Sequence, residues 1–213
     1  MPLTPDGWDA HHESYRSWLI GELEALGGDV DLLGHDWGAG HTYNVLAERP
    51  DLLRSWAADC AGLLHPDYAW HDAAQQWQTP EVGEQFVEAW IGMPPADKAA
   101  LFASLGLPPA VAESVASALD AEMGRCILAL YRSAAQPVMQ HLGDRLGERK
   151  SAGELPRGLA LLPSEDPYVG TPAMGQFVAT HLGAEIAPLA GLGHWWMLED
   201  PAAAADRLVA FWA

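Results

Sequence analysis

The chain has 213 residues, of which 49% are hydrophobic, enough to fill the interior of one domain with an insertion. Eleven Lys and Arg residues against 29 Asp and Glu residues give a formal charge of −18. This charge argues against nucleic acid and anionic membranes as partners, because both would repel it. With no leader, no apolar run of the ~20 residues that cross a bilayer and only two cysteines, Cys60 and Cys126, we expect a cytoplasmic protein.

Two strands and two helices are predicted in the first 60 residues. Residues 11–28 repeat apolar side chains at helical spacing and end in two glycines. The apolar run 29–33 predicts a strand, and 39–49 predicts a helix that stops before Pro50. Residues 55–60 predict the second strand. A glycine-flanked turn separates the first strand from the helix that follows it.

Two further strands are predicted near the C-terminus, at 158–163 and 184–190. The helix between them has Thr171 as N-cap, a proline at its first position and Gly183 at its end. A last helix begins at Asp200. Strands that alternate with helices form parallel crossovers, so we predict an α/β fold, a parallel sheet with helices on its faces.

The middle of the chain, 65–150, contains no run typical of a strand. Prolines divide it into segments with helical patterns, and we expect this block to be a helical lid (cap) inserted between 1–64 and 151–213, which form the sheet domain. The four predicted helices are 80–91, 95–105, 108–123 and 124–142.

The turn after the first strand reads GHDWG, with Asp36 between Gly34 and Gly38. Small residues on both sides lift the central side chain clear of the backbone, since a Cβ at either position would meet neighbouring main chain. The following helix directs its free amides at the same place, which suits an anion. The alternative is an ordinary turn in which Asp36 is the N-cap of the helix.

The GHDWG turn resembles the nucleophile elbow of the α/β-hydrolases, in the branch of epoxide hydrolases and haloalkane or haloacetate dehalogenases. Two further motifs follow in that family's order of nucleophile, acid and histidine. They are LLPSEDPY, which places Asp166 after a strand, and GLGHWWMLEDP, which contains His194. The resemblance implies a catalytic set of Asp36, His194 and Asp166.

The resemblance implies attack of Asp36 on an electrophilic carbon and hydrolysis of the resulting ester by water that His194 activates. Epoxide hydrolysis is the expected activity, and dehalogenation is the alternative. Trp37, Tyr131 and His35 are expected to bind the small-molecule substrate. Tyr131-Arg132, within LALYRSA, resembles the Tyr-Arg pair that ends the family's lid, which implies that Tyr131 donates to an epoxide oxygen. No cofactor or metal is expected, since the nine histidines lack zinc-ligand spacing. Asp59 is expected to be solvated or to cap a helix.

The family has further strands before the elbow, including one that precedes a His-Gly loop with an oxyanion amide. The resemblance therefore implies an N-terminally truncated hydrolase domain, because the opening residues resemble a segment that follows that loop. The strand at 29–33 would then have an unpaired apolar edge, through which the chain can form a homo-oligomer. A catalytically impaired binding or structural subunit stays open as the non-enzyme alternative.

Overall fold

A computed structural model describes residues 7–213, which divide into two compact units. The first unit contains residues 7–15 and 72–135, and the second contains 16–71 and 136–213. The opening residues 1–6, part of the segment that resembles the family upstream of the elbow, lie outside the described residues. Among residues 7–213, no helix has both the length and the apolar character that a bilayer crossing requires.

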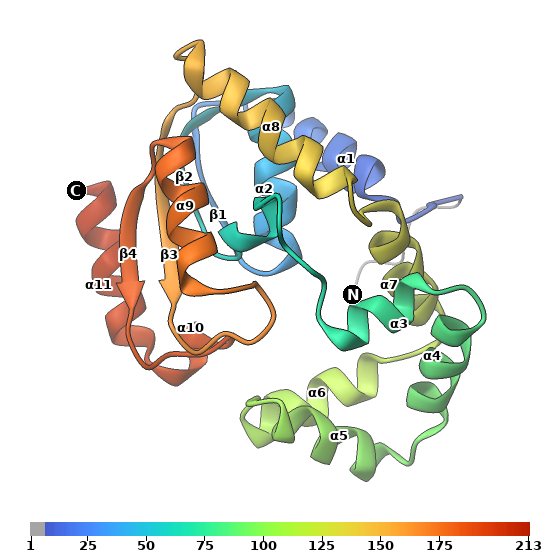
Figure 1. The fold of residues 1–213 in the computed structure, drawn as a ribbon. Helices are drawn as coiled ribbons and strands as arrows, with labels where there is room; N and C mark the ends of the chain where they lie inside the picture. The colour runs from blue at the N-terminus through green and yellow to red at the C-terminus, as the bar shows by residue number, and fades with distance from the viewer. Residues whose placement is uncertain (1–6) are drawn as a thin grey trace. The chain divides into compact units, whose positions relative to one another are not determined.

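A four-stranded parallel sheet forms the centre of the second unit (Figure 1). Its strands lie in chain order, so each strand pairs with the one that precedes it in sequence. This arrangement confirms the predicted α/β class, and the bounds agree with the predicted strands to within two residues. The strands are β1 (Val30–Gly34), β2 (Leu53–Ala58), β3 (Arg157–Pro163) and β4 (Glu185–Leu189).

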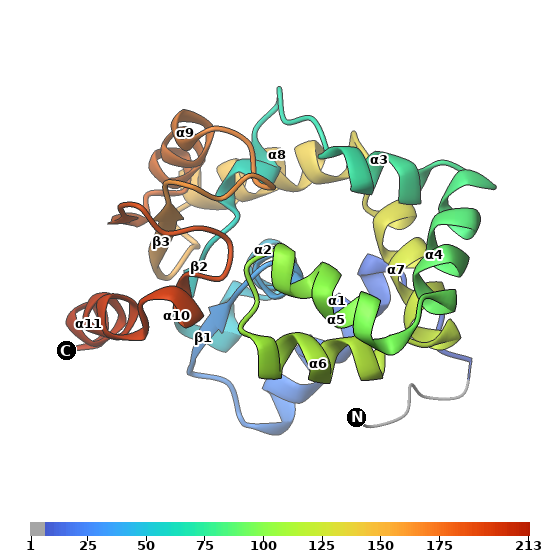
Figure 2. The ribbon, with the colours of Figure 1, turned by 90° about the horizontal axis from the view of Figure 1, so that it is seen from below.

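Helices cover both faces of this sheet (Figure 2). On one face, α2 (Trp37–Glu48) contacts β1 and β2, α9 (Pro172–Leu182) contacts β3 and β4, and α8 (Val138–Ser151) packs on both helices. On the other face, α11 (Pro201–Trp212) packs against the sheet and contributes two residues to a hydrophobic core. The buried residues of this core are Ala57, Leu159, Leu161, Ala187, Leu189, Trp196, Ala204 and Phe211. The remaining elements with residues in this unit are α1 (His12–Ala25), η1 (Pro50–Leu52), η2 (Ala61–Leu64) and α10 (Trp196–Glu199).

The predicted N-cap Thr171, the predicted helix end at Gly183 and the predicted start of the last helix at Asp200 are confirmed. The Thr171 side chain accepts a hydrogen bond from the amide of Met174 at 3.3 Å, and Gly183 ends α9 with φ at 69°. The Asp200 carboxylate accepts from the amide of Ala203 at 3.0 Å. These contacts satisfy backbone groups at the helix ends and fix where α9 and α11 start.

The described residues of the first unit form helices joined by short loops and contain no strand. Trp77, Phe86, Trp90 and Tyr131 pack edge to face, with ring centroids 4.7–6.0 Å apart. The predicted bounds of the helices 108–123 and 124–142 are wrong, because one helix ends at Ala118 and the next runs from Ala121 to Ser133. The helices are α3 (Asp72–Gln78), α4 (Val82–Gly92), α5 (Pro95–Ser104), α6 (Pro109–Ala118) and α7 (Ala121–Ser133).

The predicted insertion, 65–150, is longer than this helical unit. The difference lies mainly in α8, which contacts α2 and α9 and therefore belongs with the sheet. The amphipathic pattern of α8 identifies it as a helix but does not indicate which partner it covers. The role of the helical unit as a lid remains a prediction.

Asp59, at the end of β2, is fully buried, so the expectation that it is solvated is wrong. Its carboxylate lies 2.5 Å from Nδ1 of His35 and accepts hydrogen bonds from the Trp196 indole at 2.7 Å and the Asp36 amide at 3.0 Å. Its own carbonyl accepts from the Tyr43 hydroxyl at 2.7 Å. Buried charge is costly unless it is hydrogen-bonded. Asp59 thus joins β2 to the turn after β1 and to α10.

Like β4, which pairs with β3 alone, β1 is one of the two edge strands of the sheet formed by residues 7–213, since it pairs with β2 alone. Only its last residue, Gly34, is buried, and Leu33 is 43% exposed. An exposed apolar edge strand offers free backbone groups to another strand. The expected unpaired edge is therefore present, while association through it stays a prediction.

Asp59→Ala is expected to lower the free energy of unfolding by about 3–5 kcal/mol, because it leaves buried donors without their acceptor. Urea denaturation measures this change. The control is Asp51→Ala, which removes an exposed partner of Arg49 and should leave the stability nearly unchanged. Equal effects of the two substitutions would contradict the structural role of Asp59.

Leu33→Lys is expected to reduce self-association, because a lysine on an edge strand disfavours pairing with a second strand. The charge of −18 opposes association at low salt, so sedimentation velocity should be compared at low and high ionic strength. Val209→Lys on α11 is the matched control, since Val209 is also exposed. If Leu33→Lys and Val209→Lys give the same distribution of species as the unaltered chain, association through β1 is wrong.

Candidate active site

Asp36 lies at the junction of β1 and α2 with a strained backbone, φ 53° and ψ −122°. Gly34 makes this junction possible, because an added Cβ would lie 2.4 Å from the carbonyl oxygen of Gly38. At Gly38 an added Cβ would meet nothing within 4 Å, so the expectation that both glycines provide room is correct only for Gly34. The close approach of strand and helix therefore depends on one glycine.

The Asp36 carboxylate makes no capping hydrogen bond to α2. The alternative in which its side chain caps the helix is therefore not supported. The Asp36 side chain is 48% exposed, and the backbone amide of Asp36 donates a hydrogen bond to the buried Asp59 carboxylate. This geometry presents a carboxylate at the carboxyl end of β1, where the strands of a parallel sheet direct their loops.

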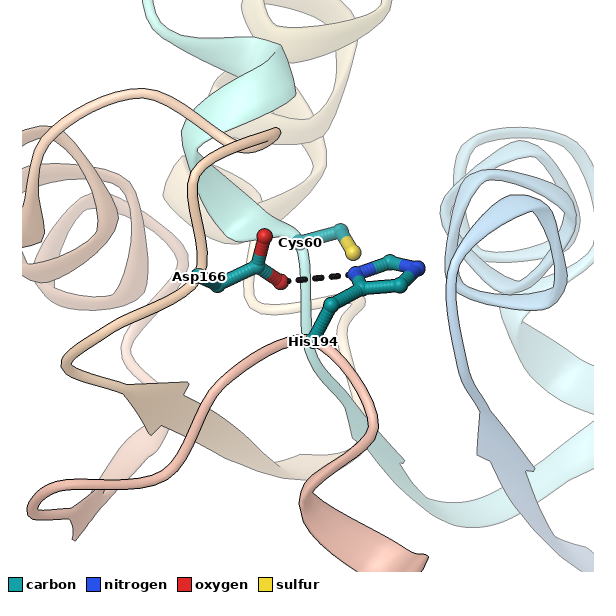
Figure 3. Close-up of side chains that lie close together, drawn as sticks. All are labelled: Cys60, Asp166 and His194. Carbon is teal, nitrogen blue, oxygen red and sulfur yellow. Dashed lines mark hydrogen bonds and ion pairs between the residues drawn. The ribbon is translucent and has the colours of Figure 1, made fainter. Parts of the chain in front are cut away.

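His194 and Asp166 meet the Asp36 carboxylate from two other loops. Asp166 lies between β3 and α9, and its carboxylate is 2.8 Å from Nδ1 of His194, which lies between β4 and α10 (Figure 3). Nε2 of His194 lies 4.0 Å from Oδ1 of Asp36. The backbone amide of Tyr168 donates to the second oxygen of Asp166 at 2.9 Å. The structure thus brings together the three residues predicted to be catalytic.

Burial and charge act on these groups in opposite directions. Desolvation raises the pKa of Asp36, although the nearby His194 and His35 oppose the shift. Burial also disfavours the charged form of His194. The hydrogen bond of His194 to Asp166 and the surrounding carboxylates outweigh this effect and raise the pKa of His194. For Asp59, burial is outweighed by the hydrogen bond to His35, which keeps its pKa low. Asp59 therefore stays charged.

His35 and Asp59 form a second histidine–carboxylate pair beside the first. Because an ionised carboxylate only accepts, Nδ1 of His35 donates to Asp59. The ring centroids of His35 and His194 are 4.8 Å apart, and Nε2 of His35 makes no hydrogen bond within residues 7–213. His35, predicted to bind substrate, therefore lies at the site with one ring nitrogen available.

Aromatic rings surround these polar groups. The Trp37 ring stacks on Trp70 at 5.8 Å, whereas Tyr168 and Trp195 meet the His194 ring edge to face at 5.0 and 4.8 Å. Tyr168 and Trp195 lie within the motifs LLPSEDPY and GLGHWWMLEDP, but neither was predicted to be a site residue, because the motifs do not indicate that these rings pack on His194. Their ring packing restricts the orientation of His194.

The two tyrosines of the predicted lid differ in their surroundings. Tyr131 lies in the first unit, where its ring packs 4.7 Å from Trp77, and its predicted contact with substrate stays untested. Tyr68 lies in the second unit and donates its hydroxyl to the carbonyl of Tyr168 at 2.7 Å. That bond orients the Tyr68 hydroxyl toward the loop after Asp166.

Neither a protein-family model nor a curated protein sequence matches this chain. Solved structures do match it. One is E-2-(acetamidomethylene)succinate hydrolase, at 15% identity and a TM-score of 0.69, covering 98% of this chain and 75% of that one. A haloalkane dehalogenase DbeA-M1 loop variant from Bradyrhizobium elkanii has 19% identity and a TM-score of 0.68, with coverage of 98% and 75%.

A third match is MGS-M2, an α/β hydrolase enzyme from a Medee basin deep-sea metagenome library. It has 18% identity and a TM-score of 0.69, and the match covers 97% of this chain and 73% of that one. Identities this low establish the fold alone. The order of strands, the elbow and the two loops that follow β3 and β4 agree with that fold. The chain therefore has the α/β-hydrolase fold.

Proposed function

We propose that the protein is a hydrolase that forms an alkyl ester on Asp36 and hydrolyses it with water activated by His194. The observation that carries this proposal is the distance of 4.0 Å between Nε2 of His194 and the Asp36 carboxylate. A hydroxyl nucleophile needs its base within hydrogen-bonding distance, whereas an ionised carboxylate needs none. The histidine is then free to serve the second step.

In the first step, one Asp36 oxygen attacks an sp³ carbon, and the bond from that carbon to its leaving oxygen or halide breaks. Asp36 must be ionised for this attack, and its partly exposed position gives the substrate access. The Trp37 indole is a candidate donor to the leaving group. Nε2 of His35 can donate there only when the ring is an imidazolium, because its Nδ1 already donates to Asp59. Their role in substrate binding is part of the proposal.

In the second step, Nε2 of His194 takes a proton from water as the water oxygen attacks the carbonyl carbon of the ester. The hydrogen bond from Nδ1 to Asp166 keeps the lone pair on Nε2 and stabilises the imidazolium that forms. The ester bond then breaks, and the leaving oxygen takes the proton from the imidazolium to give the product alcohol. The carboxyl group of Asp36 releases its proton and returns as a carboxylate, so the cycle consumes one water molecule.

Epoxides are the proposed substrate class, on the strength of the resemblance at Tyr131. Haloalkanes are the second candidate, which Trp37 and the similarity to a dehalogenase favour. The two classes leave different masses on the enzyme. An epoxide adds its whole mass to Asp36, because the leaving oxygen stays attached, whereas a haloalkane adds its mass less that of the hydrogen halide.

His194→Gln is expected to accumulate the ester on Asp36, because the first step does not need the imidazole and the second does. Incubation with a styrene-oxide-like epoxide or a haloalkane, followed by peptide mass spectrometry, detects the adduct and its class. His181→Gln, on the surface of α9, is the matched control and should turn over without accumulation. Asp36→Asn should reduce turnover by about 10⁴-fold or more.

The ester mechanism is wrong if His194→Gln carries no adduct on the peptide that contains Asp36 while the unaltered enzyme hydrolyses the same substrate. Absence of turnover above Asp36→Asn for both substrate classes would instead favour the binding or structural subunit.

Asp36→Asn is also expected to lower the pKa of His194, since it removes one of the negative charges that stabilise the imidazolium. NMR titration of the ring in both proteins measures this shift without any substrate. In the unaltered enzyme the raised pKa places the neutral, active imidazole at higher pH than an ordinary histidine, so hydrolysis falls as the pH drops through that value. Asp51→Asn is the control, and an unchanged pKa in Asp36→Asn would show that the two groups do not interact.

A further inference from the structure

A buried thiol lies beside the His194–Asp166 pair. Cys60 follows β2 directly, is 2% exposed and carries a free thiol. One potential ligand atom from each of Cys60, Asp166 and His194 lies within 4.8 Å of the other two (Figure 3). All three side chains are buried. Sequence spacing does not reveal this set, because its members come from three loops at the carboxyl ends of β2, β3 and β4.

We propose that Cys60, His194 and Asp166 form a binding site for a thiophilic divalent cation of the zinc or cadmium type. Thiolate, imidazole and carboxylate are together the ligand set that such ions select, with water filling the fourth position. Figure 3 shows the sulfur on the same side of the imidazole as Nδ1 and the Asp166 oxygens. Nδ1 is therefore the ring nitrogen that faces the proposed ion.

The local charge favours a cation. Three carboxylates, those of Asp36, Asp59 and Asp166, lie in or beside the cluster. Only two histidines, His35 and His194, accompany them. With neutral imidazoles the set carries three negative charges, and two imidazolium ions would still leave it negative. A divalent cation thus reduces unfavourable buried charge. It must displace the thiol proton, because burial and these carboxylates hold the pKa of Cys60 above its ordinary value.

Binding exchanges a defined set of bonds. The S–H bond of Cys60 breaks and a metal–sulfur bond forms, releasing one proton to solvent. The proton on Nδ1 of His194 is replaced by the metal, and the neutral ring then carries its proton on Nε2. Such a ring has no lone pair toward Asp36. The ion would therefore prevent His194 from accepting a proton from water; this consequence rests on the proposed function, whereas metal binding does not.

Cadmium is the direct probe, because a cadmium–thiolate bond has an ultraviolet charge-transfer absorption that needs no activity. Titration of the full chain with Cd²⁺ should give this band at one ion per chain. Cys60→Ser should abolish the band and weaken Zn²⁺ binding at least about 10-fold, since even partners outside the ligand shell contribute that much. Cys126→Ser is the matched control, because Cys126 is the only other cysteine and lies in the first unit.

A band that persists in Cys60→Ser, or its absence from the unaltered chain, overturns the proposal. A second readout avoids substitution altogether. Nitrogen NMR of the unaltered protein should show Zn²⁺ shifting Nδ1 of His194 while Nε2 stays protonated. A shift confined to Nε2 would place the ion on the Asp36 side and overturn the proposed site. If Zn²⁺ binds as described but hydrolysis is unaffected or absent, the proposed function fails and the metal site stands.

Discussion

The hydrogen bond from the Asp36 amide to the buried carboxylate of Asp59 is the constraint on which the site depends. A backbone with φ at 53° is unfavourable for any side chain with a Cβ, and it persists only when surrounding contacts hold it. Asp59 supplies one such contact and also binds His35 and the Trp196 indole. The ends of β1 and β2 are thereby fixed to α10. The carboxylate of Asp36 can then be exposed to solvent and lie 4.0 Å from Nε2 of His194, because its own backbone is already held.

Two histidine–carboxylate pairs lie side by side, and their surroundings differ. The His194–Asp166 pair leaves Nε2 directed at Asp36, so it can act on a proton. The His35–Asp59 pair is tied to the turn and to the core, so it holds the elbow and supplies charge near it. Placing three carboxylates together requires such compensation, since each raises the energy of the others. The same excess of negative charge favours a divalent cation beside Cys60.

Local patterns predicted what depends on local structure. The strands, the cap at Thr171 and the start of the last helix at Asp200 follow from short motifs, and the structure places each of them as expected. Short motifs also identify Asp36, Asp166 and His194, which the structure brings together. Asp59 and the placement of α8 could not be predicted in this way. The sequence around a single aspartate after a strand does not show whether its carboxylate faces solvent or three hydrogen-bond donors from distant segments. The pattern of an amphipathic helix likewise does not show which surface the helix packs against.

Isotope labelling in a single turnover tests the central claim most directly. The enzyme is used in excess over substrate in H₂¹⁸O. In the ester mechanism the product takes its new oxygen from Asp36, because water attacks the carbonyl carbon of the ester. The product of the first turnover should then lack ¹⁸O, and the peptide that contains Asp36 should gain it. A labelled product together with an unlabelled Asp36 would mean that water attacks the substrate directly, and the ester mechanism would be contradicted.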